Sequence, residues 1–359
     1  MFYKRIFMIL VIVVGMVMGF AGCKDTKESP VLLEEEGPST GSNDDIMEEI
    51  VDSKKAREEE KGVASPISGL YTQEESIIKR RPIAVMLDNQ RQARPQAGLD
   101  QAEIIYEILA EGWITRYMAV FLINEPELIG PVRSARPYFI DKAMEFNGLY
   151  VHDGGSPQAF SDIVKFKVAD IDAQSRSSKV FWRKSHKSRP HNEYTSAQAI
   201  RAAAKQSNYK EIGDFETLLF HDEDQKINGI KTTYIKILYH KDYKPSFEYH
   251  EEENLYYRYI NGQPHRDEVS EKHLAAKNII VQKAKTKVID SAGRREIGLV
   301  GEGEGYFITY GAMKEIIWKK PSRRAITRFY DKNGEEITLN PGVTWIEVIP
   351  SNLEITTVE

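Results

Sequence analysis

The chain has 359 residues, of which 41% are hydrophobic and 10% aromatic, so it can bury an ordinary apolar core. Its formal net charge of −5 argues against a general nucleic-acid binder, because such proteins need a basic surface. Cys23 is the single cysteine, so disulfides, thiolate catalysis and cysteine-ligated zinc are excluded if that residue carries a lipid.

The N-terminus has the layout of a signal peptide. A short basic start precedes an apolar run from residue 6 to residue 20, and the sequence FAGC follows. FAGC resembles the lipobox of bacterial lipoproteins, in which Cys23 becomes the acylated N-terminus. An uncleaved anchor is the alternative, but the run is short for a spanning helix. We expect residues 1–22 to be a lipoprotein signal peptide and the protein to be lipid-anchored on the extracytoplasmic face of the cell membrane.

Residues 23–75 are rich in Glu, Asp, Ser, Gly and Pro and poor in aromatic residues. Such a composition buries too little surface to fold by itself. It predicts a flexible acidic linker, which as a coil of about 50 residues would reach roughly 40 Å from the membrane.

Strands alternating with helices predict an α/β domain with a mixed sheet over residues 76–225. Continuous apolar runs at residues 81–89 and 114–123 predict buried strands. Residues 100–110 are predicted to form a helix that Gly112 ends. In that helix the apolar side chains would share one face, and Glu103, Glu107 and Glu111 would follow one another at intervals of one turn.

Three further helices are predicted in the same domain. One begins near Pro137, one has Ser156 as its N-cap before a proline, and one is capped by Thr195 or Ser196. From about residue 226 the pattern changes to alternating apolar and polar residues, with turn signals such as Asn-Gly between the runs. The prediction is therefore an α+β fold, with an N-terminal α/β domain and a β-rich C-terminal domain of hairpins over residues 226–359.

Several motifs resemble the YerB-like family of Gram-positive lipoproteins. They are IIYEILAEGWITRYMAVF at residues 104–121, IGPVRSARPYF at 129–139, VHDGGSP at 151–157, FWRKSHKSRPHNEY at 181–194 and GVTWIEVIP at 342–350. The resemblance extends from about residue 81 to the C-terminal region. It implies the same division into domains and the same location, but no reaction, because the family is a domain of unknown function.

Polar residues gather at the predicted strand and helix ends of the first domain, where ligands of open α/β sheets bind. The candidate binding or catalytic residues are Glu107, Glu111, Arg116, Arg133, Ser134, Arg136, His152 and Asp153. We expect Glu107 or Glu111 to contact one of these arginines, and the cluster to border a pocket that includes His152 or Asp153. The alternative is a structural ion-pair network without a function.

The catalytic version of this hypothesis is a glycan-cleaving envelope enzyme, with Glu111 beside Trp113 as general acid. No second carboxylate has a clear position in the sequence. Ser156 lacks the setting of a nucleophile elbow and is better explained as a helix cap. We expect no cofactor and no metal, because His152, Asp153 and His191 lack a known ligand spacing.

The loop at residues 174–194 interleaves cations with aromatic residues, a pattern typical of proteins that bind anionic polymers. Its candidate polyanion-binding residues are Arg183, Lys184, Lys187, Arg189 and His191. Teichoic acids and lipid head groups are the polyanions outside a Gram-positive cell. A solvated basic loop is the alternative. The leading hypothesis is a lipoprotein that binds or scaffolds an anionic polymer, a glycan or another envelope protein, and the enzyme is second.

Overall fold

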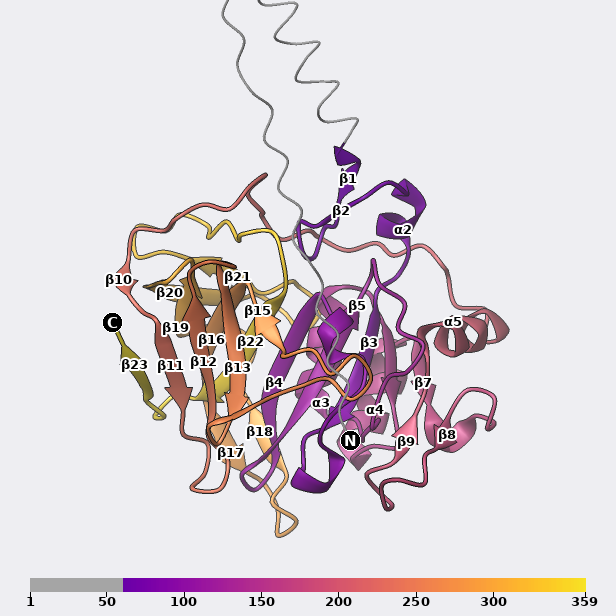
Figure 1. The fold of residues 1–359 in the computed structure, drawn as a ribbon. Coiled ribbons are helices and arrows are strands. Elements are labelled where there is room, and N and C mark those ends of the chain that lie inside the picture. The colour runs from indigo at the N-terminus through magenta and orange to yellow at the C-terminus, as the bar shows by residue number, and fades with distance from the viewer. Residues whose placement is uncertain (1–60) are drawn as a thin grey trace, which may run out of the picture. The chain divides into compact units, whose positions relative to one another are not determined.

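A computed structural model describes residues 61–359, so the predicted signal peptide, Cys23 and most of the predicted linker lie outside the described residues. A large mixed sheet runs through the described chain (Figure 1). Its strand order is β10 (Ile230–Lys231), β20 (Ala312–Lys320), β19 (Gly301–Thr309), β16 (Asn278–Ala284), β22 (Thr344–Pro350), β4 (Ile104–Glu111), β5 (Ile114–Phe121), β3 (Ile83–Asp88), β6 (Leu149–His152) and β7 (Asp170–Asp172), with β21 (Arg328–Tyr330) beside β20.

Both halves of the sequence contribute to this sheet. The join is the pair β22 and β4, which are parallel and place Glu347 opposite Glu107. β16 and β22, β3 and β6, and β6 and β7 are also parallel, and the remaining pairs are antiparallel. The α+β fold class is confirmed, and the β-rich half and the α/β half share one sheet.

A second, antiparallel sheet is formed by the β-rich half alone. Its order is β14 (Gln263–Pro264), β13 (Leu255–Ile260), β12 (Pro245–His250), β11 (Tyr234–Ile237) and β23 (Ile355–Val358), with β15 (Ala275–Ala276) beside β13. The remaining pairs are β1 (Val63–Ala64) with β2 (Tyr71–Thr72), β8 (Trp182–Arg183) with β9 (Glu193–Tyr194), and β17 (Thr286–Val288) with β18 (Arg295–Ile297).

The helices are α2 (Glu75–Lys79), α3 (Pro137–Glu145), α4 (Pro157–Phe166) and α5 (Ala197–Gln206) within residues 61–359, besides the 3₁₀ turns Arg91–Ala93, Leu99–Gln101 and Ala173–Ser175. The predictions for α3, α4 and α5 are confirmed. Ser156 and Ser196 cap α4 and α5 by accepting the N–H groups of Ala159 and Ala199.

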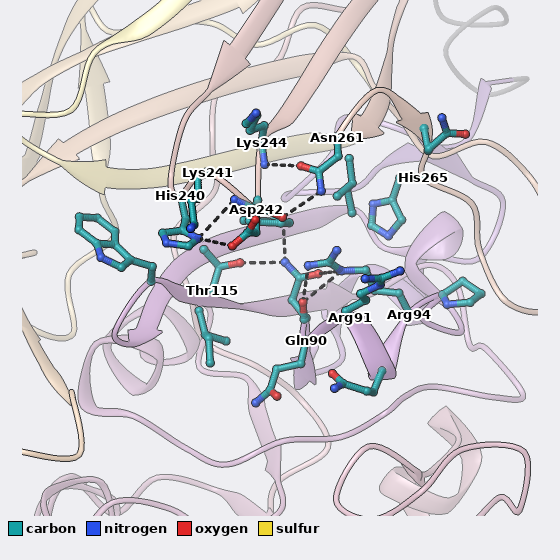
Figure 2. Close-up of a pocket in the computed structure, with 18 of the residues that line it drawn as sticks. Gln90, Arg91, Arg94, Thr115, His240, Lys241, Asp242, Lys244, Asn261 and His265 are labelled. Carbon is teal, nitrogen blue, oxygen red and sulfur yellow. Dashed lines mark hydrogen bonds and ion pairs between the residues drawn. The ribbon is translucent and has the colours of Figure 1, made fainter.

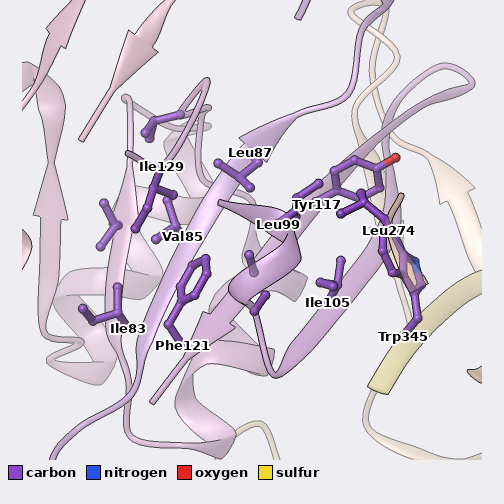
Figure 3. Close-up of a cluster of buried hydrophobic side chains, with 14 of the residues drawn as sticks. Ile83, Val85, Leu87, Leu99, Ile105, Tyr117, Phe121, Ile129, Leu274 and Trp345 are labelled. Atoms are coloured by element: carbon purple, nitrogen blue, oxygen red, sulfur yellow. The ribbon is translucent and has the colours of Figure 1, made fainter. Parts of the chain in front are cut away.

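Each face of the large sheet is covered. On one face, Leu87, Ile105, Tyr117 and Trp345 pack with residues of the small sheet and of α5, and Figure 3 shows part of this cluster. On the other face, Ile104, Tyr106 and Met118 pack with α3 and α4. β4 is therefore buried on both faces, so apolar side chains are favoured on both.

The helix predicted for residues 100–110 is wrong, because residues 104–111 form β4. A strand buried on both faces is a continuous apolar run, and its periodicity does not distinguish it from a buried helix. The paired Ile104 and Ile105 and the following Tyr106 favour a strand, because β-branched and aromatic side chains pack well on a pleated surface. Gly112 has φ of +55° and supplies the positive φ of the two-residue turn into β5.

The flexible linker predicted to reach residue 75 is wrong for residues 61–75. These residues form β1, β2 and the start of α2, and Ile67 is fully buried. Ser65 and Ser68 donate hydrogen bonds of 2.7 and 2.5 Å to the Glu103 carboxylate. The compositional argument fails here because this short segment is ordered by contacts with the sheet, not by a core of its own.

Candidate functional site

Three glutamates that a helix would have aligned are separated by the strand geometry of β4. Glu103 precedes the strand and accepts hydrogen bonds from Ser65, Ser68 and the backbone N–H groups of Leu122 and Ile123. Glu107 lies on the face beneath the small sheet. A register shift between Leu109 and Glu111 lets Glu111 meet arginines beside α3 on the other face. Each carboxylate therefore belongs to a different site.

Glu107 belongs to an ionic network that is fully buried between the two sheets. The Arg258 guanidinium, on β13, contacts the carboxyl groups of both Glu107 and Glu347, and all three side chains have 0% exposure. The Arg258 to Glu347 distance is 3.0 Å, and Tyr239 donates a 2.9 Å hydrogen bond to the second Glu347 oxygen. Arg258 also stacks on Trp345, with its guanidinium 4.3 Å from the ring centroid. Burial, and then the neighbouring Glu107, raise the pKa of Glu347 well above its usual value.

Glu107 also fixes the base of a cavity. Tyr243 and Thr115 donate hydrogen bonds of 2.5 and 2.6 Å to one Glu107 oxygen, and the Asn89 amide donates to the same oxygen at 3.2 Å. Asn89 in turn accepts a 2.9 Å hydrogen bond from Nε of Arg94. The buried carboxylate thus orients Asn89, and Asn89 orients a cation that lines the cavity.

The cavity, of about 1120 Å³, opens between the end of β3, the β4–β5 turn and two turns of the small sheet. Among residues 61–359, one carboxylate lines it, that of Asp242, together with five cations: Arg91, Arg94, Lys241, Lys244 and Arg266. Figure 2 shows Arg91 and Arg94 from the loop after β3 and Lys241 and Lys244 from the loop between β11 and β12. We call it the cationic cavity. Exposed Trp113 adds an aromatic ring to its wall.

The charges of the five cations in the cavity are not neutralised by nearby carboxylates of the described chain. Within residues 61–359, none of the five forms an ion pair with a carboxylate. Arg94 instead contacts Asn89 and lies over the Tyr243 ring at 4.7 Å, and Arg266 donates to the backbone carbonyl of Glu271. Like charges that line one concavity raise the local potential and concentrate anions there. This arrangement can bind an anionic group with several cations at once.

Glu111, the candidate general acid, is enclosed by two arginines. Arg116 contacts one of its carboxylate oxygens at 2.9 Å and Arg136 pairs with the other. The prediction that one of these glutamates contacts Arg116, Arg133 or Arg136 is therefore correct for Glu111. Burial, and then the neighbouring Arg136, lower the pKa of Arg116 to about 10. The Arg116 guanidinium also donates to the Ser134 carbonyl at 2.8 Å, a backbone role for Ser134.

The remaining predicted residues form a second set of ion pairs, which joins the candidate cluster to the basic loop. Asp88, at the end of β3, accepts contacts from Arg133 at 3.1 Å and from His191 at 2.7 Å. Arg183 pairs with Glu193 at 2.5 Å and lies 3.9 Å from Asp153. These loop residues therefore have partners within the protein.

The candidate cluster was expected to border a pocket that includes His152 or Asp153. His152 is fully buried, donates a 2.9 Å hydrogen bond from Nδ1 to the Gly154 carbonyl, and lies 3.5 Å from Asp170. Neither residue lines the cationic cavity or the cavity of about 570 Å³ beside α3. The ends of β3 and β6 do bring predicted residues together, but as paired charges.

The other cations of the basic loop differ in their surroundings. Lys187 is largely buried and pairs with Glu268, and it also donates to backbone carbonyls of Ala93 and Pro95. Lys184 lies over the Tyr194 ring at 5.6 Å, and Arg189 is exposed. The loop thus offers fewer unpaired cations than the cationic cavity, although its role as a polyanion site remains a hypothesis.

Sequence reasoning missed the residues that line the cationic cavity. They come from turns far apart in the sequence, near residues 90–95, 113–115, 240–244 and 260–266, which only the packing of the two sheets brings together. The sequence around Arg258 does contain a pattern that predicts its burial. The alternation in β13 places it on the same buried face as Tyr256 and Ile260, and a charge in that row predicts a buried partner.

No group of three or more metal-binding side chains occurs within the part of the chain that the structure describes. Among the same residues, no helix has the length and apolar character to cross a membrane.

Comparison with known proteins identifies the family to which this chain belongs. The N-terminal domain model of the protein family of unknown function DUF3048 matches residues 67–210, and the C-terminal domain model of DUF3048 matches residues 235–346. The chain is 34% identical over 293 residues to YerB of Bacillus subtilis (strain 168), which is described as a candidate lipoprotein. That alignment covers 81% of this chain and 87% of the relative.

The fold is also that of a solved structure. The crystal structure of the YerB protein from Bacillus subtilis matches with a TM-score of 0.75 and 33% identity, and the match covers 82% of this chain and 99% of that one. The resemblance seen in the sequence motifs is therefore confirmed at the level of the family and of the fold.

Proposed function

The chain belongs to the YerB-like DUF3048 family, and from that premise we propose that it is a lipid-anchored extracytoplasmic protein that binds an anionic ligand of the cell envelope in the cationic cavity. The relative's description as a candidate lipoprotein and the FAGC sequence support the anchor at Cys23. The observation that supports the ligand class is the set of five cations facing one carboxylate in a cavity of about 1120 Å³.

Binding is favoured over catalysis. A general acid must reach a leaving group, whereas the two guanidinium groups beside Glu111 occupy both of its oxygens. Of the residues that the structure describes, Asp242 is the one carboxylate that lines the cationic cavity, whereas glycan hydrolysis uses a pair. An anionic polymer or an anionic glycan fits the excess of positive charge.

The test is retention of a linear phosphodiester polymer, poly(glycerol phosphate), by the full chain in detergent micelles, with dextran as the neutral control. The triple variant Arg91→Gln, Lys241→Gln and Lys244→Gln should bind roughly tenfold more weakly at low salt. It should also reduce the salt slope by about 2 to 3, because each cation contact releases counterions, by analogy with nucleic acids.

A matched control separates site binding from net charge. Lys205, Lys231 and Lys319 are exposed and line neither this cavity nor the one beside α3. Their replacement by Gln removes the same charge and should leave retention near the parent value. A second arm replaces Lys184 and Arg189 in the basic loop. Equal loss in both triple variants, or loss only in the loop variant, would refute the assignment of the ligand to the cationic cavity.

A further inference from the structure

A second cavity lies beside α3, and one of its lining residues contacts the β4–β5 turn that borders the cationic cavity. It has a volume of about 570 Å³, and its lining includes Arg136, Tyr138, Asp290, Arg294, Arg295 and Arg323. We call it the α3 cavity. That residue is Arg295, whose Nε donates a 2.8 Å hydrogen bond to the Gly112 carbonyl. The Arg295 guanidinium also lies 5.1 Å from the centroid of the Trp113 ring, which lines the cationic cavity.

The two cavities differ in charge. The α3 cavity is lined by four arginines and four carboxylates, so its charged groups balance. Arg323 is paired with Asp141 and Asp162, and Arg294 is paired with Asp290. A surface that alternates guanidinium donors and carboxylate acceptors suits hydroxyl groups, because each hydroxyl both donates and accepts a hydrogen bond.

Arg136 lines the α3 cavity at the start of α3. Arg136 is 8% exposed, and its Nε forms no hydrogen bond, although its other nitrogens contact Glu111 and the Ala135 carbonyl. A buried donor without an acceptor destabilises the fold. Arg136 is also the N-cap of α3, a nine-residue helix with no side-chain cap at this end. A ligand oxygen in the α3 cavity would lie near the Arg136 guanidinium and the positive end of the helix.

The turn between the cavities is apolar and exposed. Trp113 is 49% exposed and Ile114 is 39% exposed, in a chain that buries most of its large apolar side chains. Gly112 is hydrogen-bonded through its N–H to the Gly293 carbonyl at 2.9 Å, so the β17–β18 hairpin holds the turn in place. An exposed aromatic ring on a fixed turn offers a surface on which a polyol or sugar unit can pack.

We propose that the cationic cavity, the turn and the α3 cavity form one binding track for a linear polyol-phosphate or sugar-phosphate chain. The phosphate groups lie among the cations of the cationic cavity, one unit crosses Trp113, and hydroxyl groups bind in the α3 cavity. This inference rests on the proposed function and adds that the ligand is a repeating chain, not a single head group.

The experiment compares synthetic glycerol-phosphate oligomers of increasing length, from one unit to about a dozen, by titration calorimetry with the full chain in micelles. A single site binds a longer chain more tightly only because the chain offers more positions to it, so the affinity rises in proportion to length. A track adds a second contact within the same complex. The affinity of the long oligomers should then exceed the value expected from length alone by roughly tenfold or more.

The variant Arg294→Glu places a negative charge in the α3 cavity at a residue that is 39% exposed. It should abolish the extra gain for long oligomers and leave the affinity of short ones unchanged. Lys319→Glu, an equal reversal outside both cavities, should behave as the parent chain. A thermal melt of each variant checks that the fold is intact.

The outcomes separate the two proposals. If no oligomer binds, both the proposed function and the track are refuted. If all oligomers bind with affinities that rise only in proportion to length, or if Arg294→Glu weakens every length equally, the track alone is refuted. Vesicles containing phosphatidylglycerol form a further arm, and binding to them as tight as to the longest oligomer would show that a single head group suffices.

Discussion

Replacing Arg258 by Met removes the cation that holds two glutamates in the interior. Met fills much of the same volume, but it leaves Glu107 and Glu347 facing each other on adjacent strands with no guanidinium between them. All three side chains are fully buried, so water cannot replace the lost contacts of Arg258. The prediction is a large loss of stability caused by uncompensated buried charge.

The expected magnitude follows from this burial. Breaking a buried pair by removing one partner costs about 3 to 5 kcal/mol, a large share of a typical unfolding free energy of about 5 to 15 kcal/mol. Urea denaturation followed by tryptophan fluorescence should show the Arg258→Met midpoint well below that of the parent chain. Arg324→Met, at an exposed arginine, is the control and should remain within about 0.5 kcal/mol.

A rescue variant tests the reason for the loss. When Glu107 and Glu347 are replaced by Gln in the Arg258→Met chain, no buried charge is left unpaired, and replacing a whole buried network is often close to neutral. Much of the lost stability should therefore return. If Arg258→Met is as stable as the parent chain, or if the triple variant is less stable than Arg258→Met, then charge compensation does not hold the two sheets together as described.

The remaining predictions concern other residues of the described sites and the anchor. Burial raises the pKa of Glu347, so the folded chain keeps its proton at a pH where the unfolded chain has lost it. The free energy of unfolding should therefore fall as the pH rises above about 4.5. Glu347→Gln should flatten this part of the pH–stability curve, and an unchanged slope would contradict the assignment. Glu111→Gln leaves Arg116 and Arg136 without their carboxylate and should cost about 2 kcal/mol in thermal or urea unfolding, whereas Glu127→Gln, at an exposed site, should cost little. Cys23→Ala should prevent incorporation of a fatty-acid probe, and persistent labelling would disprove the lipobox.

The sequence predicts the structure correctly where a local rule, such as helix capping, determines it. Prolines and capping serines located α3, α4 and α5, because these residues act within one helical turn. Asn261-Gly262 located the hairpin from β13 to β14 for the same local reason. The local pattern of residues 104–111 predicts a helix instead of β4, because two-sided burial is a tertiary property that no local pattern records.

The candidate site was only partly predictable for a related reason. Glu111 and its arginines lie near one another in the sequence around the same strand ends, and their pairing was expected. Glu107 has its principal partner, Arg258, 151 residues away in the small sheet, and the cationic cavity likewise depends on how that sheet covers β4 and β5. Charge complementarity shows that a partner must exist, but it does not show which cation provides it.

Photo-crosslinking from inside the cationic cavity tests the central claim most directly. Gln92 is exposed and lines the cavity, and Lys179 is exposed in the basic loop. Each is replaced in turn by p-benzoylphenylalanine in the full chain, which is then irradiated in micelles with labelled poly(glycerol phosphate). The account predicts a crosslink from position 92 that weakens with added salt and with unlabelled polymer, and little from position 179. A crosslink from position 179 alone, or none from position 92 under conditions where the polymer is retained, would contradict the claim that the cationic cavity binds the ligand.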